Sequence, residues 1–119
     1  MTNPVQNSQL QFDKIEVGDR VRHVREAEAL DVVSVEPHRI VGTRRVLITN
    51  QHEWDRDLRS LIPGDRVRSI PKQNVYIVLG QNSLGIVGER TVEITDPKGW
   101  MRVVTKDQIP ENAKDIFRV

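Results

Sequence analysis

The sequence predicts an all-β protein that contains one small unit twice. The segment Gly18–Val24 (GDRVRHV) returns as Gly64–Ile70 (GDRVRSI), 46 residues later. A second pair of segments returns at the same offset, because Val46–Arg56 and Val92–Arg102 both begin with a β-branched run and end in W-x-R. β-Branched runs beside Gly-Asp turns are typical of short strands. A fixed offset between two such pairs therefore indicates a duplicated β domain.

The repeat divides the chain into four parts. We expect a flexible N-terminal tail at 1–16, one unit at 17–63, a second unit at 64–110 and a C-terminal tail at 111–119 that packs back. The first tail is too polar to offset the entropy of ordering, and Phe12 and Ile15 are expected to anchor its end. Because Pro63 and Gly64 join two small units without a spacer, the units should pack together or exchange strands.

Alternation of apolar and polar residues between turn signals predicts the strands. They are expected at 20–25, 30–36 and 39–49 in the first unit, and at 66–70, 74–79, 84–89, 91–95 and 100–105 in the second. Gly42 is expected to interrupt the third strand, and Asp96–Gly99 to form a turn between the last two. Short turns at 58–62 and 106–109 are expected to close the two units.

The inner strands suggest a different offset from the outer segments. Leu30–Val33 resembles Leu84–Val87, and this alignment requires an offset of 54 residues. We therefore expect about eight additional residues in the second unit, at 71–83, and a matching surplus in the first unit between Val35 and Val46. On this alignment the longer loop lies at a different place in each copy.

Composition restricts the class of protein. The chain has 119 residues, a mean hydropathy of −0.49 and no apolar run long enough to span a bilayer. It contains no cysteine, which excludes disulfides and thiolate metal sites, and its first residues do not resemble a signal peptide. A cytoplasmic location without a membrane partner is therefore expected. The net charge of +1 means that any electrostatic site must be local.

The strongest candidate for a binding site is the stretch 38–45 in the surplus of the first unit. It has no acidic residue and is expected to form a hairpin that presents guanidinium groups to phosphates. The candidate nucleic-acid-binding residues are His38, Arg39, Arg44 and Arg45, extended by Arg22 and Arg25. In the alternative interpretation the hairpin is solvated, and its arginines pair with Glu26, Glu28 and Glu36.

No other group of residues predicts catalysis, a metal or a cofactor. Glu53, Asp55 and Asp57 would share one face of a strand, as metal binding or acid–base work requires, but a polar turn balanced by arginines is the favoured interpretation. Trp54 and Trp100 occupy matched positions and suit core packing better than base stacking. The three histidines lack metal-ligand spacing, and no serine lies in a nucleophile-elbow pattern. We therefore expect a protein that is not an enzyme and uses no cofactor.

A strand opened by Gly-Asp-x-Val, a variable loop, β-branched strands and a closing Ile-Pro together resemble the SH3-like barrel class, and KOW and Tudor-like modules within it. The resemblance covers about residues 17–110 as two copies. Gly85 matches the glycine that a KOW module places just before its paired valines, whereas Asp31 stands at that place in the first unit. The resemblance implies two tandem SH3-like barrels packed together, and contact with RNA, DNA or a nucleic-acid-bound protein complex.

Two functions stay open on the sequence. A nucleic-acid-associated module would use the arginines of the first unit, and the local cluster and the resemblance favour it. A protein-interaction or assembly module would use a sheet edge or the groove between the units, and the near-neutral net charge favours it. Neither pattern indicates an oligomeric state.

Overall fold

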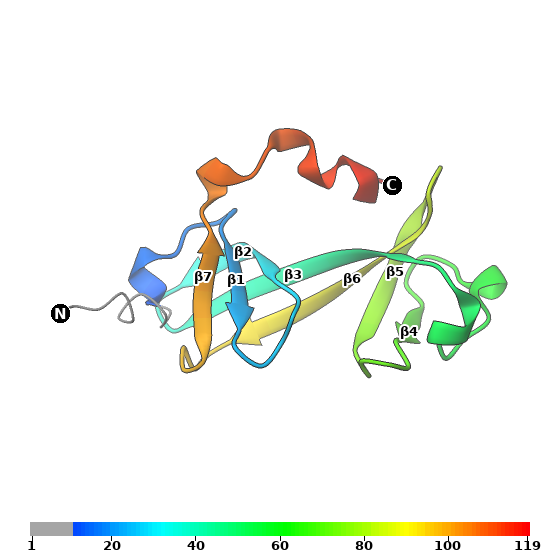
Figure 1. The fold of residues 1–119 in the computed structure, drawn as a ribbon, viewed down its shortest axis with the longest axis horizontal. Helices are drawn as coiled ribbons and strands as arrows, with labels where there is room; N and C mark the ends of the chain where they lie inside the picture. The colour runs from blue at the N-terminus through cyan, green and yellow to red at the C-terminus, as the bar shows by residue number, and fades with distance from the viewer. Residues whose placement is uncertain (1–10) are drawn as a thin grey trace. The chain divides into compact units, whose positions relative to one another are not determined.

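The all-β fold class is confirmed by the computed structural model, which describes residues 11–119 apart from three side chains in the last helix. Seven strands form one sheet in the order β4-β5-β6-β3-β2-β1-β7 (Figure 1). Their bounds are Arg20–His23 (β1), Leu30–Glu36 (β2), Arg39–Ile48 (β3), Arg66–Arg68 (β4), Val75–Asn82 (β5), Gly85–Ile94 (β6) and Trp100–Val104 (β7). The helices described are short 3₁₀ turns, and none of them is long and apolar enough to span a bilayer.

The chain forms two compact units that differ from the expected ones. Of the described residues, one unit combines 11–44 with Thr91–Pro110, and the other combines Arg45–Arg90 with Glu111–Val119. The boundaries fall inside β3 and β6, whereas the sequence pattern placed a boundary after Pro63. A ten-residue strand extends over roughly 33 Å. Each of these two strands is therefore long enough to contribute one half to each unit.

The first unit closes around the apolar faces of β1, β2 and β3 and the end of β6. Its buried core consists of Ile15, Val21, Leu30, Val32, Ile40 and Ile94. Alternation selects these residues, since Val21 is buried while its neighbours Arg20 and Arg22 are only half-buried. Ile94 comes from the second sequence repeat, so the core already combines residues of both repeats.

The N-terminal end of the described chain belongs to the first core. Phe12–Lys14 forms the 3₁₀ helix η2, and Ile15 follows it with 6% of its surface exposed. The predicted anchoring by Phe12 and Ile15 is confirmed, and residues 12–16 are part of the folded unit, because buried apolar contacts offset the entropy of ordering them. The rest of the predicted tail, residues 1–10, lies outside the described residues.

The second unit builds an equivalent core from other residues. Its buried members are Ile48, Leu61, Val67, Tyr76 and Val78. The 3₁₀ helix η4 (Leu58–Ser60) precedes Leu61 as η2 precedes Ile15, and Leu61 is likewise 6% exposed. A 3₁₀ turn is therefore present where one was expected at 58–62, but it opens the second repeat and does not close the first.

The two repeats match at an offset of 46 throughout the strands. β3 and β6 have ten residues each and begin 46 positions apart. The β2–β3 pairing shifts register between Val32 and Ser34, and the β5–β6 pairing shifts between the corresponding Val78 and Gly80. A bulge is a backbone feature that is retained when a hairpin is copied. The matched bulges therefore identify the two hairpins as copies of one another.

The alignment of Leu30 with Leu84 is wrong. Leu30 is 2% exposed in the first core, and Tyr76, which lies 46 positions later, is 2% exposed in the second. Leu84 instead lies at the tip of the β5–β6 hairpin with 54% of its surface exposed. The expected surplus of about eight residues is absent, because the alignment matched leucine to leucine although the core position accepts an aromatic residue.

Two glycines in long strands provide room for neighbouring side chains. Gly42 is buried in β3, where a Cβ would lie 2.9 Å from Leu30 Cβ. Gly88 occupies the copied position in β6, where a Cβ would lie 2.6 Å from Ile48 Cδ1. The predicted interruption at Gly42 is therefore wrong, because glycine here permits close packing instead of a turn. The predicted division of β6 at Arg90 is also wrong, since the strand is continuous from Gly85 to Ile94.

Each repeat has the same turn before its first strand. Gly18 and Gly64 adopt φ angles of +100° and +95°, a conformation that favours glycine. The Gly18 N–H donates to the Val32 carbonyl at 2.9 Å, and the Gly64 N–H donates to the Val78 carbonyl at 2.8 Å. The turn therefore requires the Gly-Asp pair in both copies and explains the most visible repeat in the sequence.

The first turn is held by a buried carboxylate. Asp19 is 1% exposed, its Oδ2 accepts the Glu16 N–H at 2.9 Å and its Oδ1 accepts the Lys106 N–H at 2.7 Å. Arg102 Nη1 lies 3.6 Å from Asp19 Oδ2. One side chain thus joins the turn of the first repeat to the strand and turn that end the second repeat.

The second turn has the reciprocal contacts. Asp65 Oδ2 accepts the Ile62 N–H at 3.0 Å and lies 3.6 Å from Arg56 Nη2. Arg56 belongs to the first repeat and Asp65 to the second, whereas Asp19 of the first repeat contacts Arg102 of the second. Each unit is therefore completed by a segment of the other repeat, which is the strand exchange that a junction without a spacer allows.

The C-terminal segment packs back on the second unit. The 3₁₀ helix η6 (Glu111–Phe117) is followed by residues that meet β5. Asn82 Nδ2 donates to the Ile116 carbonyl at 2.9 Å and to the Arg118 carbonyl at 2.8 Å. A Cβ at Gly80 would lie 3.3 Å from Val119 Cβ, so the end of the chain lies directly against β5.

A fragment that ends after Pro63 should not fold as a monomer. It would lack the end of β6 and all of β7, and with them Ile94 and Trp100 of the first core. We expect residues 1–63 to give a poorly dispersed amide spectrum and no cooperative thermal transition. A monomeric fragment that melts cooperatively would contradict the exchange of strands between the repeats.

Replacement of Asp19 should destabilise the protein more than replacement of its copy. Asp19→Ala removes a buried carboxylate and leaves two partly buried N–H groups without their acceptor, so we expect a loss of about 3 kcal/mol in the free energy of unfolding. Asp65→Ala removes a carboxylate whose side chain is 25% exposed, and a loss of about 1 kcal/mol is expected. Urea denaturation measures both free energies of unfolding. Equal losses in the two variants would show that the burial of Asp19 does not increase its contribution to stability.

Candidate binding surface

The predicted basic stretch lies on the β2–β3 hairpin, whose loop consists of Pro37 and His38. Arg39 Nη2 donates to Glu36 in the same hairpin, and Arg39 Nη1 donates to Glu93 at 2.8 Å. The hydrogen bond and the charge of Glu36, followed by the charge of Glu93, raise the pKa of Arg39. In the free protein this guanidinium is therefore engaged by two carboxylates.

Arg44 and Arg45 also have carboxylate partners. Arg44 Nε donates to Glu28 at 2.9 Å, and Arg45 Nε donates to Glu89 at 3.1 Å. Adjacent residues of a strand point to opposite faces, so the side chains of Arg44 and Arg45 leave β3 on opposite sides. The alternative interpretation expected these arginines to pair with Glu26, Glu28 and Glu36. Glu28 pairs with Arg44, and Glu36 pairs with Arg39.

The remaining predicted residues do not complete a common site. Arg22 Nη1 donates to the Glu26 carbonyl at 3.0 Å. Arg25 and His38 are exposed in loops on either side of β2. The structure therefore places the six predicted residues beside acidic partners, beside a backbone acceptor or in solvent.

The two copies of the first hairpin differ in charge. The segments 20–31 and 66–77 correspond at the offset of 46. The first copy balances three arginines with three acidic residues, Glu26, Glu28 and Asp31. The second copy has no acidic residue and carries Arg66, Arg68 and Lys72. The formal charge is therefore zero in the first copy and +3 in the second.

Four exposed side chains form one face of the second hairpin. Arg66 lies opposite Ile77 and Arg68 lies opposite Val75 across β4 and β5. Ile77 is 42% exposed and Val75 is 39% exposed, whereas Val67 between the arginines is buried. Within the described part of the chain, neither guanidinium has a hydrogen bond or an ion pair. We call Arg66, Arg68, Val75 and Ile77 the β4–β5 face.

An ion pair occupies the corresponding position in the first unit. Arg20 lies opposite Asp31 across β1 and β2, and its Nε donates to Asp31 Oδ1 at 2.8 Å. At the offset of 46, Arg66 takes the place of Arg20 and Ile77 takes the place of Asp31. The β4–β5 face therefore keeps the cation of the first unit and replaces its carboxylate with an aliphatic side chain.

The outer edge of β4 is already paired within the second unit. Ser69 forms an antiparallel bridge with Trp54, and the Ile70 N–H donates to the Glu53 carbonyl at 2.8 Å. The Asp55 N–H donates to the Arg68 carbonyl at 3.1 Å. This edge is not free to accept an added strand, so a ligand of the second hairpin has to lie on its face.

Both tryptophans make packing contacts. The Trp54 indole N–H donates to the Thr49 carbonyl at 2.7 Å, and its ring meets the edge of Tyr76 with centroids 5.7 Å apart. Trp100 packs against His23 at 5.2 Å in the same T-shaped manner. Both rings thus pack against another ring, and the N–H of Trp54 is also hydrogen-bonded. These contacts favour the packing interpretation over base stacking.

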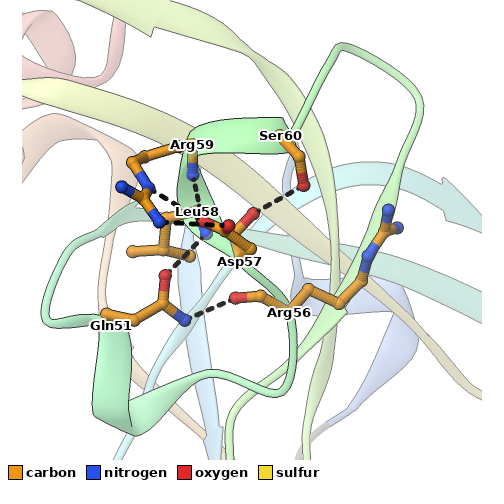
Figure 2. A network of polar contacts seen from close by, with 6 residues as sticks. All are labelled: Gln51, Arg56, Asp57, Leu58, Arg59 and Ser60. Atoms are coloured by element: carbon orange, nitrogen blue, oxygen red, sulfur yellow. Dashed lines mark hydrogen bonds and ion pairs between the residues drawn. The ribbon is translucent and has the colours of Figure 1, made fainter.

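The polar turn before η4 is a closed hydrogen-bond network (Figure 2). Asp57 Oδ1 accepts the Arg59 N–H at 3.0 Å and so caps η4. This backbone hydrogen bond, together with the Arg59 guanidinium, lowers the pKa of Asp57. Gln51 accepts the Leu58 N–H at 2.7 Å and donates to the Arg56 carbonyl at 2.6 Å.

The neighbouring carboxylates have similar structural contacts. Asp55 Oδ1 accepts the Arg68 N–H at 2.9 Å, and Glu53 accepts a hydrogen bond from Asn50 at 3.0 Å. Among residues 11–119, no cluster of three histidine or acidic side chains could hold a metal ion. These contacts support the polar-turn interpretation of the acidic residues around Trp54.

Comparison with protein-family models, with curated protein sequences and with solved structures finds no match. The two copies within the chain can still be compared with each other. They differ most clearly in charge, because the second hairpin has no acidic residue and the first has three.

Sequence reasoning missed the β4–β5 face because it aligned the inner strands at an offset of 54. The paired Gly-Asp turns alone allow the two copies to be aligned at an offset of 46 residues. This alignment matches each acidic residue of the first hairpin with a basic, neutral or aliphatic residue of the second. These matches are Glu26 with Lys72, Glu28 with Asn74, and Asp31 with Ile77.

The cap at Asp57 should give a pH-dependent contribution to stability. Its pKa is lowered in the folded state, so its contribution is present above the unfolded pKa of about 4 and is lost as the pH falls through the folded value. We expect Asp57→Ala to lower the melting temperature at pH 7, with a smaller effect at pH 3. Asp57→Asn, which keeps a capping oxygen, is the control and should melt above Asp57→Ala at pH 7. A difference independent of pH would exclude the charge of Asp57 as its cause.

Proposed function

We propose that this protein is a non-catalytic binding module, built from two small SH3-like barrels, that holds a protein partner on the β4–β5 face. One observation carries this proposal: two exposed arginines in a hairpin without acidic residues lie opposite two exposed aliphatic side chains. The short antiparallel strands and the Gly-Asp turn of each unit support the barrel assignment and its likeness to KOW and Tudor-like modules.

A protein partner would use all four side chains of the β4–β5 face. Val75 and Ile77 would gain roughly 25 cal/mol for each Å² of apolar surface removed from water. Arginine is enriched in protein interfaces, where its planar head donates hydrogen bonds and its stem covers apolar surface. A phosphate backbone would engage Arg66 and Arg68 but offers little aliphatic surface to the other two residues. The composition of the face therefore favours a polypeptide.

RNA or DNA is the second candidate partner. Arg66, Arg68 and Lys72 give hairpin 66–77 a formal charge of +3, and phosphate contacts are made largely by such side chains. The predicted arginines at 39, 44 and 45 would have to exchange carboxylate partners for phosphates. The tryptophans, which would stack on bases, have packing contacts instead. A protein partner is for these reasons the first candidate.

Peptides selected from a random display library on the full-length protein should depend on the β4–β5 face. We expect the double variant Arg66→Glu with Arg68→Glu to weaken their binding at least tenfold, because it reverses the charge of the face. The control Lys14→Glu with Lys98→Glu makes the same charge change at two exposed lysines and should bind as the parent does. Both variants should melt within about 2 °C of the parent, since surface charges contribute little to stability. Selected peptides that bind the first variant as tightly as the parent would refute the proposed site.

Titration with oligonucleotides tests the second candidate. Binding through Arg39, Arg44 and Arg45 would show a log–log salt slope of about −2 to −3 and would be abolished by reversing all three to glutamate. We expect no such binding by the parent at physiological salt. A salt-dependent affinity that this triple variant loses, while Arg66→Glu with Arg68→Glu retains it, would establish nucleic acid as the partner instead. The melting temperature of the triple variant has to be measured in parallel, because the change also breaks the ion pairs with Glu28 and Glu89.

A further inference from the structure

The first unit shows which chemical group the β4–β5 face lacks. In that unit Arg20 Nε donates to Asp31 Oδ1 at 2.8 Å, and the two residues lie opposite each other in neighbouring strands. Arg66 and Ile77 have the same register in the second unit. The first hairpin therefore shows how a carboxylate can bind this arginine, because Asp31 in the neighbouring strand accepts the hydrogen bond of Arg20.

We propose that the β4–β5 face binds an acidic, extended protein segment, which places a carboxylate against Arg66 as Asp31 lies against Arg20. This inference rests on the proposed function and adds the chemistry of the partner. Charge complementarity supports it, because hairpin 66–77 carries Arg66, Arg68 and Lys72 and has no acidic residue, whereas its copy contains three. A carboxylate of the partner would thus take the place beside Arg66 that Asp31 takes beside Arg20 in the first unit.

The geometry of the face restricts the spacing of the acidic residues. Arg66 and Arg68 are two positions apart on β4, which corresponds to roughly 6.8 Å along a strand. Carboxylates two residues apart on an extended segment have the same spacing. Each can accept two parallel hydrogen bonds from a guanidinium, which is the strongest common form of this contact. A segment with an acid-x-acid pattern therefore matches the two arginines.

The aliphatic side chains strengthen these contacts and restrict the flanking residues. Val75 and Ile77 lie directly beside the arginines, in the neighbouring strand. Ile70, which follows β4 in the next turn, is also exposed, with 48% of its surface accessible. Aliphatic residues of the partner that cover this surface would exclude water, and an ion pair is worth more where water is excluded. The preferred ligand is consequently acidic and aliphatic, in contrast to a polyanion without apolar groups.

A single substitution can return the missing carboxylate to the chain itself. Ile77→Asp places the acid of the first unit opposite Arg66 and should occupy the guanidinium internally. Ile77→Asn is the matched control, because it removes the same aliphatic surface without adding charge. The probe is a fluorescent peptide with two aspartates, two positions apart, among valines and isoleucines, and its counterpart carries asparagines instead. Both are titrated against the full-length protein by fluorescence anisotropy.

We expect the aspartate peptide to bind the parent at least tenfold more tightly than the asparagine peptide. Ile77→Asn should weaken binding of the aspartate peptide about threefold, and Ile77→Asp should weaken it at least a further tenfold. Residue 77 lies between Arg66 on β4 and Glu89 on β6, so the melting temperatures of both variants are measured to confirm that each is folded. Equal binding by the two Ile77 variants, or equal affinity of the two peptides for the parent, would overturn the inference.

The outcomes separate this inference from the proposed function. If selected peptides without acidic residues bind, and Arg66→Glu with Arg68→Glu abolishes their binding, the proposed function stands and the acidic ligand is refuted. If no peptide depends on those two arginines, both fail together. If an oligonucleotide of equal charge displaces the aspartate peptide and binds more tightly, the site recognises phosphate, and the inference is likewise refuted.

Discussion

The fold depends on the buried carboxylate of Asp19. It accepts hydrogen bonds from the Glu16 and Lys106 N–H groups and lies beside Arg102, so two segments more than 80 residues apart in sequence meet at one side chain. A buried carboxylate is stable only when its acceptor capacity is used. The core of the first unit can therefore close only when the end of the second repeat is in place. Asp65, with Arg56, imposes the reciprocal condition on the second unit.

Exchange between the repeats follows from this condition and from the length of β3 and β6. Both strands pass from one compact unit to the other, and each unit is completed by a segment of the opposite repeat. Each core therefore combines residues of both repeats, as Ile94 in the first and Ile48 in the second illustrate. The same constraint explains why the two copies could diverge at their surface, since the contacts that unite them lie at the turns and in the cores.

Divergence has been greatest where the fold does not depend on the side chain. The outer faces of the hairpins are free of the packing that fixes Val21 and Val67, so the two copies can carry Asp31 in one and Ile77 in the other without loss of either core. The Arg20–Asp31 pair is partly exposed, and ion pairs near the surface contribute little to stability. Such positions are where two copies of a domain can differ in their surface while they share a core.

The sequence by itself determined the all-β class, the duplication, the strand Leu30–Glu36 and the Gly-Asp turns, because alternation and turn chemistry are local properties. It also contained the charge difference between the two hairpins, which an alignment at 46 residues makes visible. Only the tertiary structure decided that β3 and β6 are continuous, that Leu30 corresponds to Tyr76, and which arginines have carboxylate partners. These features depend on which strands become neighbours, and that choice is made by burial of Asp19 and by core packing between residues far apart in the chain, which no local pattern records.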